Sequence, residues 1–234
     1  MSDFFKQPLF GVFITLLAFY IAQIIRGKFK FVLLNPVLVA IAFIMLFLFS
    51  FDISFDDYNK GGQFLTFFLG PSIVALGVLF YEKYDEIKHN LIPFLIAVVV
   101  GGIISIATVT IIAILINAPE VIIRSLASKS VTTPIAIEIT RITGGIPSIT
   151  AGVVIAVGIF GNAFGPSILK LTGIKSKSAM GTALGTAAHG IGTARALEEG
   201  KLTGAYSGMA MCINGLVTAV VTPWFLTWIL KVMA

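Results

Sequence analysis

Charge is scarce in this chain. Asp, Glu, Lys and Arg together make up 12% of its 234 residues, whereas hydrophobic residues make up 57%. A soluble domain carries about a quarter charged residues, so the composition excludes an ordinary soluble protein and indicates an integral membrane protein. The net charge of +5 is explained by membrane topology, because no cluster of Lys and Arg resembles a nucleic-acid surface. We therefore expect the lipid bilayer, and no nucleic acid, as a partner.

Cysteine is almost absent as well. The single cysteine, Cys212, lies in an apolar segment, which excludes an intrachain disulfide and argues against a metal cluster. The sequence shows no pair of catalytic carboxylates, no nucleophile with its base, no phosphate-binding loop and no metal-ligand spacing. We therefore expect neither an enzyme nor a bound cofactor or metal, and H⁺ or Na⁺ remains open as a coupling ion.

What the chain does contain is long apolar runs. They occupy residues 7–25, 31–49, 62–81, 91–117, 146–165 and 203–230. Each is near or above the roughly 20 residues that a helix needs to cross the hydrocarbon core. No cleavage pattern precedes the first run, so we expect it to be a retained span. Gly70 and Pro71 are expected to break the third span near its centre.

Basic residues between these runs predict the orientation. They place the loops 26–30, 82–90 and 166–178 in the cytoplasm and the N-terminus outside. Segments 119–143 and 178–199 are interrupted by polar residues and by Pro or Gly, and on this topology each must enter and leave the membrane on one side. We predict an all-α membrane protein with about six transmembrane helices and two opposed re-entrant hairpins or broken helices. Inverted repeats of this outline are typical of secondary transporters.

This outline also predicts two functional parts. Residues 1–117 would form a scaffold of four spans, and residues 118–234 would form a transport half of two hairpin-plus-span units. The hairpin tips are expected at residues 130–134 and 186–190, with substrate held between them near the midplane.

The first tip has the pattern of an anion-binding helix start. Pro134 suits the first helical position, Thr132 or Thr133 suits the N-cap, and Gly144 suits the helix end. A helix over 134–143 would be about 15 Å long, so its positively polarised N-terminus would lie near the midplane and stabilise a carboxylate. The alternative is an ordinary capped helix that begins at the surface. The candidate substrate ligands here are Ser130, Thr132 and Thr133.

Glu138 and Arg141 lie three residues apart on the same short helix. Each charge costs about 2.5–3.5 kcal/mol at the bilayer centre, so we expect both side chains to face inward and to pair. In the functional interpretation Arg141 contacts the substrate, and Glu138 titrates or binds a coupling cation. In the alternative interpretation they form a structural salt bridge.

The second tip combines glycines with polar side chains. Read as a helix, it has one stripe made of Thr182, Thr186, His189 and Thr193. Thr186, His189 and Thr193 are candidate substrate contacts. His189 is also a candidate for proton coupling, and the alternative is a structural histidine. Gly190, like Pro134 in the other tip, is expected to break the helix.

Several strings of residues resemble the LrgB/CidB antiholin-like family. They are Leu69-Gly70-Pro71 with Val74-Ala75-Leu76, and residues 129–136, 144–148, 165–166 and 185–194. The resemblance covers nearly the whole chain. It implies a multi-pass protein of the bacterial inner membrane, connected with murein hydrolase control and cell lysis, beside a small holin-like partner of the LrgA/CidA type. It also implies kinship with the plastid glycolate/glycerate translocator and with bacterial relatives linked to pyruvate uptake.

Two functions are compatible with these patterns. The first is a transporter of small monocarboxylates, namely 2-hydroxy or 2-oxo acids such as glycolate, glycerate and pyruvate. The alternative is an antiholin-like regulator that restrains a holin-type partner and so controls murein hydrolase activity and lysis. A transporter requires polar groups around a buried site, whereas a regulator needs only glycine-rich faces for helix packing. We expect a homo-oligomer, a dimer, in either case.

Overall fold

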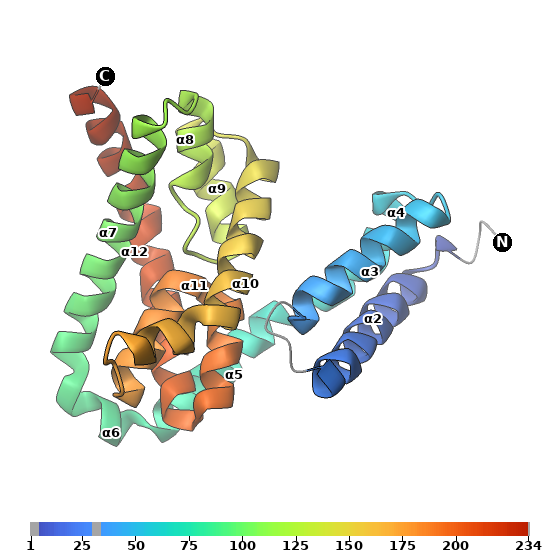
Figure 1. The fold of residues 1–234 in the computed structure, drawn as a ribbon, viewed down its shortest axis with the longest axis horizontal. Helices are drawn as coiled ribbons and strands as arrows, with labels where there is room; N and C mark the ends of the chain where they lie inside the picture. Colours follow the sequence, from blue (N-terminus) through green and yellow to red (C-terminus); the bar gives the residue numbers. More distant parts are fainter. Residues whose placement is uncertain (1–4, 30–33, 234) are drawn as a thin grey trace. The chain divides into compact units, whose positions relative to one another are not determined.

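The computed structural model describes residues 5–29 and 34–233 (Figure 1). All regular elements in these described ranges are helices, so the predicted all-α fold is confirmed. The chain divides into two compact units, residues 1–75 and residues 76–234. Helix α5 (Leu69–Glu82) runs from one into the other.

The first unit contains α2 (Pro8–Phe29), α3 (Pro36–Ser50) and α4 (Phe55–Phe67). Helix α2 packs against both of the others. It approaches α4 most closely where Gly11 faces Gly61, because a Cβ atom on either glycine would collide with the backbone of the other helix. Beside this contact the hydroxyl groups of Thr15 and Tyr58 lie 2.8 Å apart. Small residues thus allow backbone contact, as is common between membrane helices.

Helices α4 and α5 are separated at Phe68. Pro71 lies in the first turn of α5 and has no N–H group, so it cannot continue the hydrogen bonding of α4. The backbone N–H of Ser72 donates to the Phe68 carbonyl at 3.0 Å and belongs to the new helix. The interruption in the predicted third span therefore lies at Phe68, just before Gly70 and Pro71.

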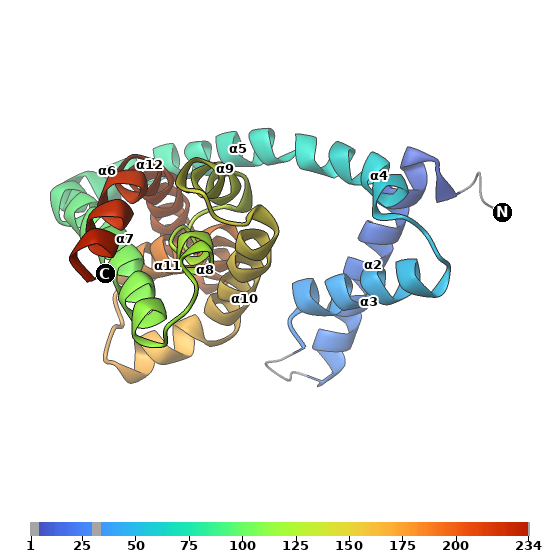
Figure 2. The same ribbon diagram turned by 90° about the horizontal axis from the view of Figure 1, so that it is seen from above.

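The second unit holds the remaining helices. They are α6 (Tyr84–Ile87), the short 3₁₀ helix η1 (Lys88–Asn90), α7 (Leu91–Leu115), α8 (Glu120–Leu126), α9 (Thr133–Thr143), α10 (Pro147–Leu171), α11 (Lys177–Glu199) and α12 (Lys201–Met233). Helix α11 packs against α7, α10 and α12, and α9 lies beside α10 (Figures 1 and 2). Helix α7, which the sequence assigns to the scaffold of residues 1–117, therefore packs in the same unit as α11 and α12. The predicted division at residue 117 concerns function and stays a prediction.

Five helices in the described part of the chain are long and apolar enough to cross a membrane. They are α2, the stretch Phe55–Leu79, the stretch Tyr84–Leu115, α10 and α12. This is a multi-pass membrane protein, as predicted. The expected span at 31–49 begins outside the described residues, and its helix α3 has 15 residues, fewer than the roughly 20 of a full crossing.

Segment 119–143 forms the first hairpin, which we define as residues 120–143. Its arms are α8 and α9, and residues 127–132 connect them. At its open end Arg124 Nη1 donates to the Thr143 carbonyl at 2.8 Å, and the backbone N–H of Ile146 donates to Ser125 Oγ at 2.7 Å. The chain therefore leaves the hairpin where it entered, beside the start of α10.

The second hairpin is α11 itself, residues 177–199. Its helix is interrupted at Ala188 (φ −128°, ψ 17°) and His189 (φ 42°, ψ −137°). The arms then run back along each other, because Met180, Leu184 and Ala196 belong to one buried cluster. A continuous helix would separate residues 180 and 196 by about 24 Å at 1.5 Å per residue.

This second hairpin opens at the other end of the unit. Lys170, near the end of α10, forms an ion pair with Glu199 at 3.1 Å, so the last turn of α11 returns to the point where α11 began. The first hairpin opens at the start of α10 and the second at its end. The two hairpins are therefore opposed, as the sequence predicts.

Candidate functional site

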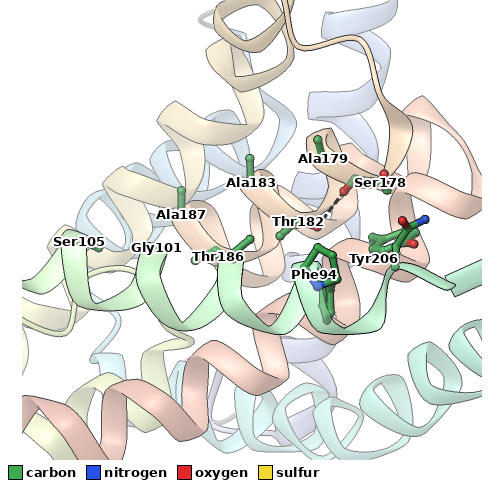
Figure 3. Close-up of a pocket in the computed structure, with 13 residues that line it drawn as sticks. Phe94, Gly101, Ser105, Ser178, Ala179, Thr182, Ala183, Thr186, Ala187 and Tyr206 are labelled. Carbon is green, nitrogen blue, oxygen red and sulfur yellow. Dashed lines mark hydrogen bonds between the residues drawn. The ribbon is translucent and has the colours of Figure 1, made fainter. Parts of the chain in front are cut away.

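A cavity of about 500 Å³ lies in the second unit between α7 and the first arm of the second hairpin (Figure 3). It runs along both helices, from Asn90 and Ser178 to Ser105 and Thr186. The lining residues on each helix recur at spacings of three and four, so one face of α7 and one face of α11 form the walls. Tyr206 of α12 adds to the wall at the end near Ser178.

The inner end of this cavity meets the tip of the first hairpin. Ser105 lines the cavity, and its Oγ lies 2.7 Å from Ser130 Oγ. Lys129 Nζ donates to both hydroxyl groups, at 3.0 Å to Ser105 and 3.2 Å to Ser130. A lysine and a serine of the first tip thus lie directly behind the cavity wall.

Asn214 of α12 joins the two hairpin tips. Its side chain is fully buried, and Nδ2 donates to the Thr186 carbonyl at 3.0 Å and to the Ser130 carbonyl at 3.4 Å. Gly102 of α7 faces this amide, and a Cβ atom there would collide with Asn214 Oδ1. One buried side chain therefore binds residues of both tips, so the tips meet at one place.

Only part of the predicted site lies at this cavity. Thr186 lines it, and Ser130 lies behind Ser105. Thr132 is the N-cap of α9, although its side chain makes no capping hydrogen bond, and Thr133 and Pro134 form the first turn. Neither threonine of this helix start is among the residues that line the cavity.

His189 lies on another side of the second hairpin. It is 4% exposed, and its Nε2 lies 2.9 Å from the Val154 carbonyl of α10. A Cβ atom on Gly158 would come within 2.8 Å of the imidazole, so this small residue makes room for the ring. The contacts fit the alternative of a structural histidine, and His189 does not line the cavity. Its roles in substrate binding and proton coupling stay predictions.

Thr193, like His189, is buried in the interior of the unit. Its Oγ1 donates to the His189 carbonyl at 2.9 Å and lies 2.9 Å from Ser207 Oγ of α12. Thr182 and Thr186 line the cavity, whereas His189 and Thr193 do not. The prediction of one stripe is wrong, because the break rotates the second arm. The non-helical residues are Ala188 and His189, immediately before Gly190.

Glu138 and Arg141 form the predicted ion pair, at 3.1 Å, on the surface of α9. Their side chains are 63% and 62% exposed, so the expectation that both face inward is wrong. The helix lies at the edge of the unit and turns its other face, with Ala136 and Ile139, to the core. The roles of Arg141 in substrate binding and of Glu138 in coupling stay predictions.

Comparison with known proteins identifies the family. The sequence matches the LrgB-like family over residues 15–228. This chain belongs to the LrgB-like family. The Antiholin-like protein LrgB of Bacillus mycoides (strain KBAB4) is 35% identical over 223 residues, which are 95% of this chain and 97% of that relative. Proteins of the same name from Bacillus cereus (strain B4264) and Bacillus anthracis (strain CDC 684 / NRRL 3495) are similar to the same extent. No solved structure matches the chain.

Sequence reasoning missed two residues of this LrgB-like protein, Ser105 and Asn214. Both are polar residues inside spans that are otherwise apolar, and each lies near a glycine that faces another helix. A polar side chain within a span is costly unless it has a partner. That cost is the signal that would have identified them.

The cavity lining carries neutral polar groups among apolar ones. It contains hydroxyl, amide and apolar groups, and within the described residues no carboxylate, imidazole or thiol contributes to it. No group of three His, Cys, Asp or Glu residues in the described LrgB-like chain is placed to hold a metal ion. The site thus offers hydrogen-bond donors with one lysine ammonium close behind them.

Proposed function

We propose that this LrgB-like protein transports small monocarboxylates, namely 2-hydroxy or 2-oxo acids such as glycolate, glycerate and pyruvate. The observation that carries the proposal is a cavity that ends where two opposed hairpin tips meet. Opposed units with a polar site at their junction are the architecture of many secondary transporters. The volume of about 500 Å³ suits a small organic ligand with water.

The charge of the site supports an anionic substrate. Lys129 brings a positive charge to the inner end, and the lining itself contributes no carboxylate from the described residues. The outer end near Asn90 and Ser178 lies beside Lys88, the first residue of η1, and Lys177, the first residue of α11. By the positive-inside rule we assign that end to the cytoplasm of a bacterial inner membrane.

Coupling and assembly are part of the same proposal. We infer that H⁺ or Na⁺ drives transport, with His189 and Glu138 as the candidate coupling residues. His189 is buried at the break of the second hairpin, where a change of hairpin conformation would alter its hydrogen bond to Val154. A homodimer is the expected assembly in the membrane.

A second candidate function comes from the names of the relatives, which are antiholin-like proteins. In this function the protein restrains a small LrgA/CidA-type holin-like partner and so controls murein hydrolase activity and lysis. The glycine face of the second hairpin is the surface that such packing would use. It is already occupied, because Cβ atoms on Gly181 and Gly185 would collide with the backbone of Thr203 and Ser207 in α12. We therefore rank this function second.

Uptake by purified protein separates the two functions. The protein is reconstituted into proteoliposomes, and entry of radiolabelled pyruvate and glycolate is measured against empty liposomes. We expect saturable uptake that unlabelled substrate inhibits. No saturable uptake, together with dye leakage that changes only when a holin-like partner is co-reconstituted, would replace the transporter by the regulator.

A further inference from the structure

Lys129 is a cation for which the described part of the chain provides no acidic partner. Among residues 5–29 and 34–233 no carboxylate pairs with it, and its Nζ donates only to the neutral hydroxyl groups of Ser105 and Ser130. The residue is only partly exposed and lies in a hairpin tip inside the membrane unit. A charge in such a place is costly, and it usually pairs or marks the path of a ligand. The missing counter-charge therefore points to an anion that enters from outside the chain.

The hydrogen bonds around Lys129 leave donors unused. An ammonium group has three N–H donors, and two of them go to the serines. The serine hydroxyl groups, 2.7 Å apart, share one hydrogen bond, so one hydroxyl proton also remains. Ser105 belongs to the cavity wall, so this cluster adjoins the space that a ligand can enter.

Thr186 gives an independent sign of a missing ligand. It lines the same cavity, is 7% exposed, and its Oγ1 has no hydrogen-bond partner within the described chain. Asn214 fixes its carbonyl, and the Cβ position of Gly101 lies 3.2 Å from its methyl group. In Figure 3 Ser105, Gly101 and Thr186 lie next to one another at the inner end. A buried hydroxyl group without a partner loses the hydrogen bonds it had in water, so a ligand that accepts from it would be stabilised.

We propose that Lys129, Ser105 and Thr186 form a subsite for the single carboxylate of the ligand. Lys129 supplies the charge, and the hydroxyl groups of Ser105 and Thr186 donate to the carboxylate oxygens. Since the described cavity lining itself contains no cation and Lys129 lies behind its inner end, a second carboxylate elsewhere in the cavity would remain uncompensated. The subsite therefore selects monocarboxylates over dicarboxylates. This inference rests on the proposed function for the physiological ligand, but binding can be measured apart from transport.

Binding to the detergent-purified protein tests the subsite. Glycolate is titrated calorimetrically, with succinate and the neutral analogue glycolamide as comparison ligands. We expect wild type to prefer glycolate to both, and Lys129→Met to weaken glycolate binding by about tenfold or more while its glycolamide binding hardly changes. Lys175→Met removes an exposed charge from the connection between α10 and α11 and is the matched control. It should leave all three affinities unchanged.

Thr186→Val adds a test that does not depend on Lys129. The substitution keeps the shape of the side chain and removes a hydroxyl group that makes no bond within the described protein. We expect glycolate binding to weaken several-fold with no loss of thermal stability. A structural role of Thr186 would instead lower the melting temperature.

Each outcome separates the subsite from the proposed function. If wild type takes up glycolate but Lys129→Met binds it with unchanged affinity, the subsite is overturned and the transporter stands. If wild type binds glycolate through Lys129 but shows no uptake, the subsite stands and the transporter fails. If Lys129→Met cannot be purified as a monodisperse protein, unchanged affinity in both Thr186→Val and Ser105→Ala overturns the subsite. If wild type binds glycolate and glycolamide equally, or neither, the subsite is also overturned.

Discussion

The two hairpins of the second unit hold their arms together by different means. The first hairpin is tied by side-chain hydrogen bonds: Ser128 Oγ lies 3.2 Å from Thr140 Oγ1, which in turn lies 2.9 Å from Thr150 Oγ1 of α10. Thr150 donates onward to the Ser125 carbonyl at 2.9 Å. The hydroxyl groups of α9, α10 and the connection between α8 and α9 thus form one buried chain of hydrogen bonds that ends on a carbonyl group of α8.

The second hairpin is held by close backbone approach instead. Cβ atoms on Gly181 and Gly185 would collide with the backbone of α12, and a Cβ atom on Gly192 would lie 2.6 Å from the Leu184 carbonyl oxygen in the other arm. It turns within two residues, and His189 adopts a positive φ, which is uncommon for a residue other than glycine. The closest contacts of this hairpin are thus made at glycines, which carry no side chain.

This difference explains what each tip contributes to the site. The connection between α8 and α9 is long enough to carry a lysine and a serine to the cavity, whereas the second tip contributes a narrow wall with the hydroxyl group of Thr186. The first hairpin should therefore be sensitive to the loss of hydroxyl groups. The second should be sensitive to added volume.

The largest effect is expected from added volume at Gly185. Gly185→Val places a branched side chain against the backbone of Ser207, so α11 and α12 must separate. Overpacking usually lowers the free energy of unfolding by about 1–3 kcal/mol. We expect Gly185→Val to reach or exceed the upper end of that range and to lower the melting temperature markedly. Gly152→Val is the matched control, because nothing lies within 4 Å of a Cβ atom there. Melting of both variants in detergent checks this, and equal melting temperatures would contradict it.

Asn214→Ala should have the next largest effect, because this amide joins both tips. Its loss leaves buried carbonyl groups of Thr186 and Ser130 without that donor, at a cost of about 1–3 kcal/mol. Asn162→Ala is the comparison, since Asn162 Nδ2 donates to the Ile191 carbonyl in the second hairpin. Hydrogen exchange measured by mass spectrometry should rise in both tips for Asn214→Ala, whereas for Asn162→Ala it should rise around residue 191. Protection of the first tip in both variants would show that Asn214 does not couple the hairpins.

The hairpins were predictable because their signals are local. Polar residues with Pro or Gly interrupt segments 119–143 and 178–199, and the positions of Lys and Arg decide on which side each segment opens. The helix start at Thr132 and Pro134 and the left-handed cap at Gly144 (φ 80°) also follow from residue type alone. Helix-end preferences of residue types and the distribution of Lys and Arg were therefore enough to predict the two hairpins.

The composition of the site was not predictable in the same way. Asn214 bonds to Ser130, 84 positions away in sequence, and such a contact depends on how α12 packs against both hairpins. The break at Ala188 and His189 decides which threonines of α11 reach the cavity, and no periodicity reveals its rotation. Glu138 and Arg141 are exposed because of where α9 packs. The packing of the helices against one another thus decides which residues reach the cavity, and the sequence pattern does not reveal that packing.

The smallest effect is expected from the exposed ion pair of the first hairpin. Glu138→Gln removes a pair whose side chains are both more than 60% exposed, so we expect it to change stability by at most about 0.5 kcal/mol. Thr140→Val, two residues further along the same helix, removes a fully buried hydroxyl group with two partners and should cost about 1–2 kcal/mol. Melting temperatures of the two variants test this order. If Glu138 couples transport as proposed, Glu138→Gln proteoliposomes should lose glycolate uptake although the variant stays folded. Retained uptake would show that this carboxylate, which does not line the cavity, is not a coupling residue.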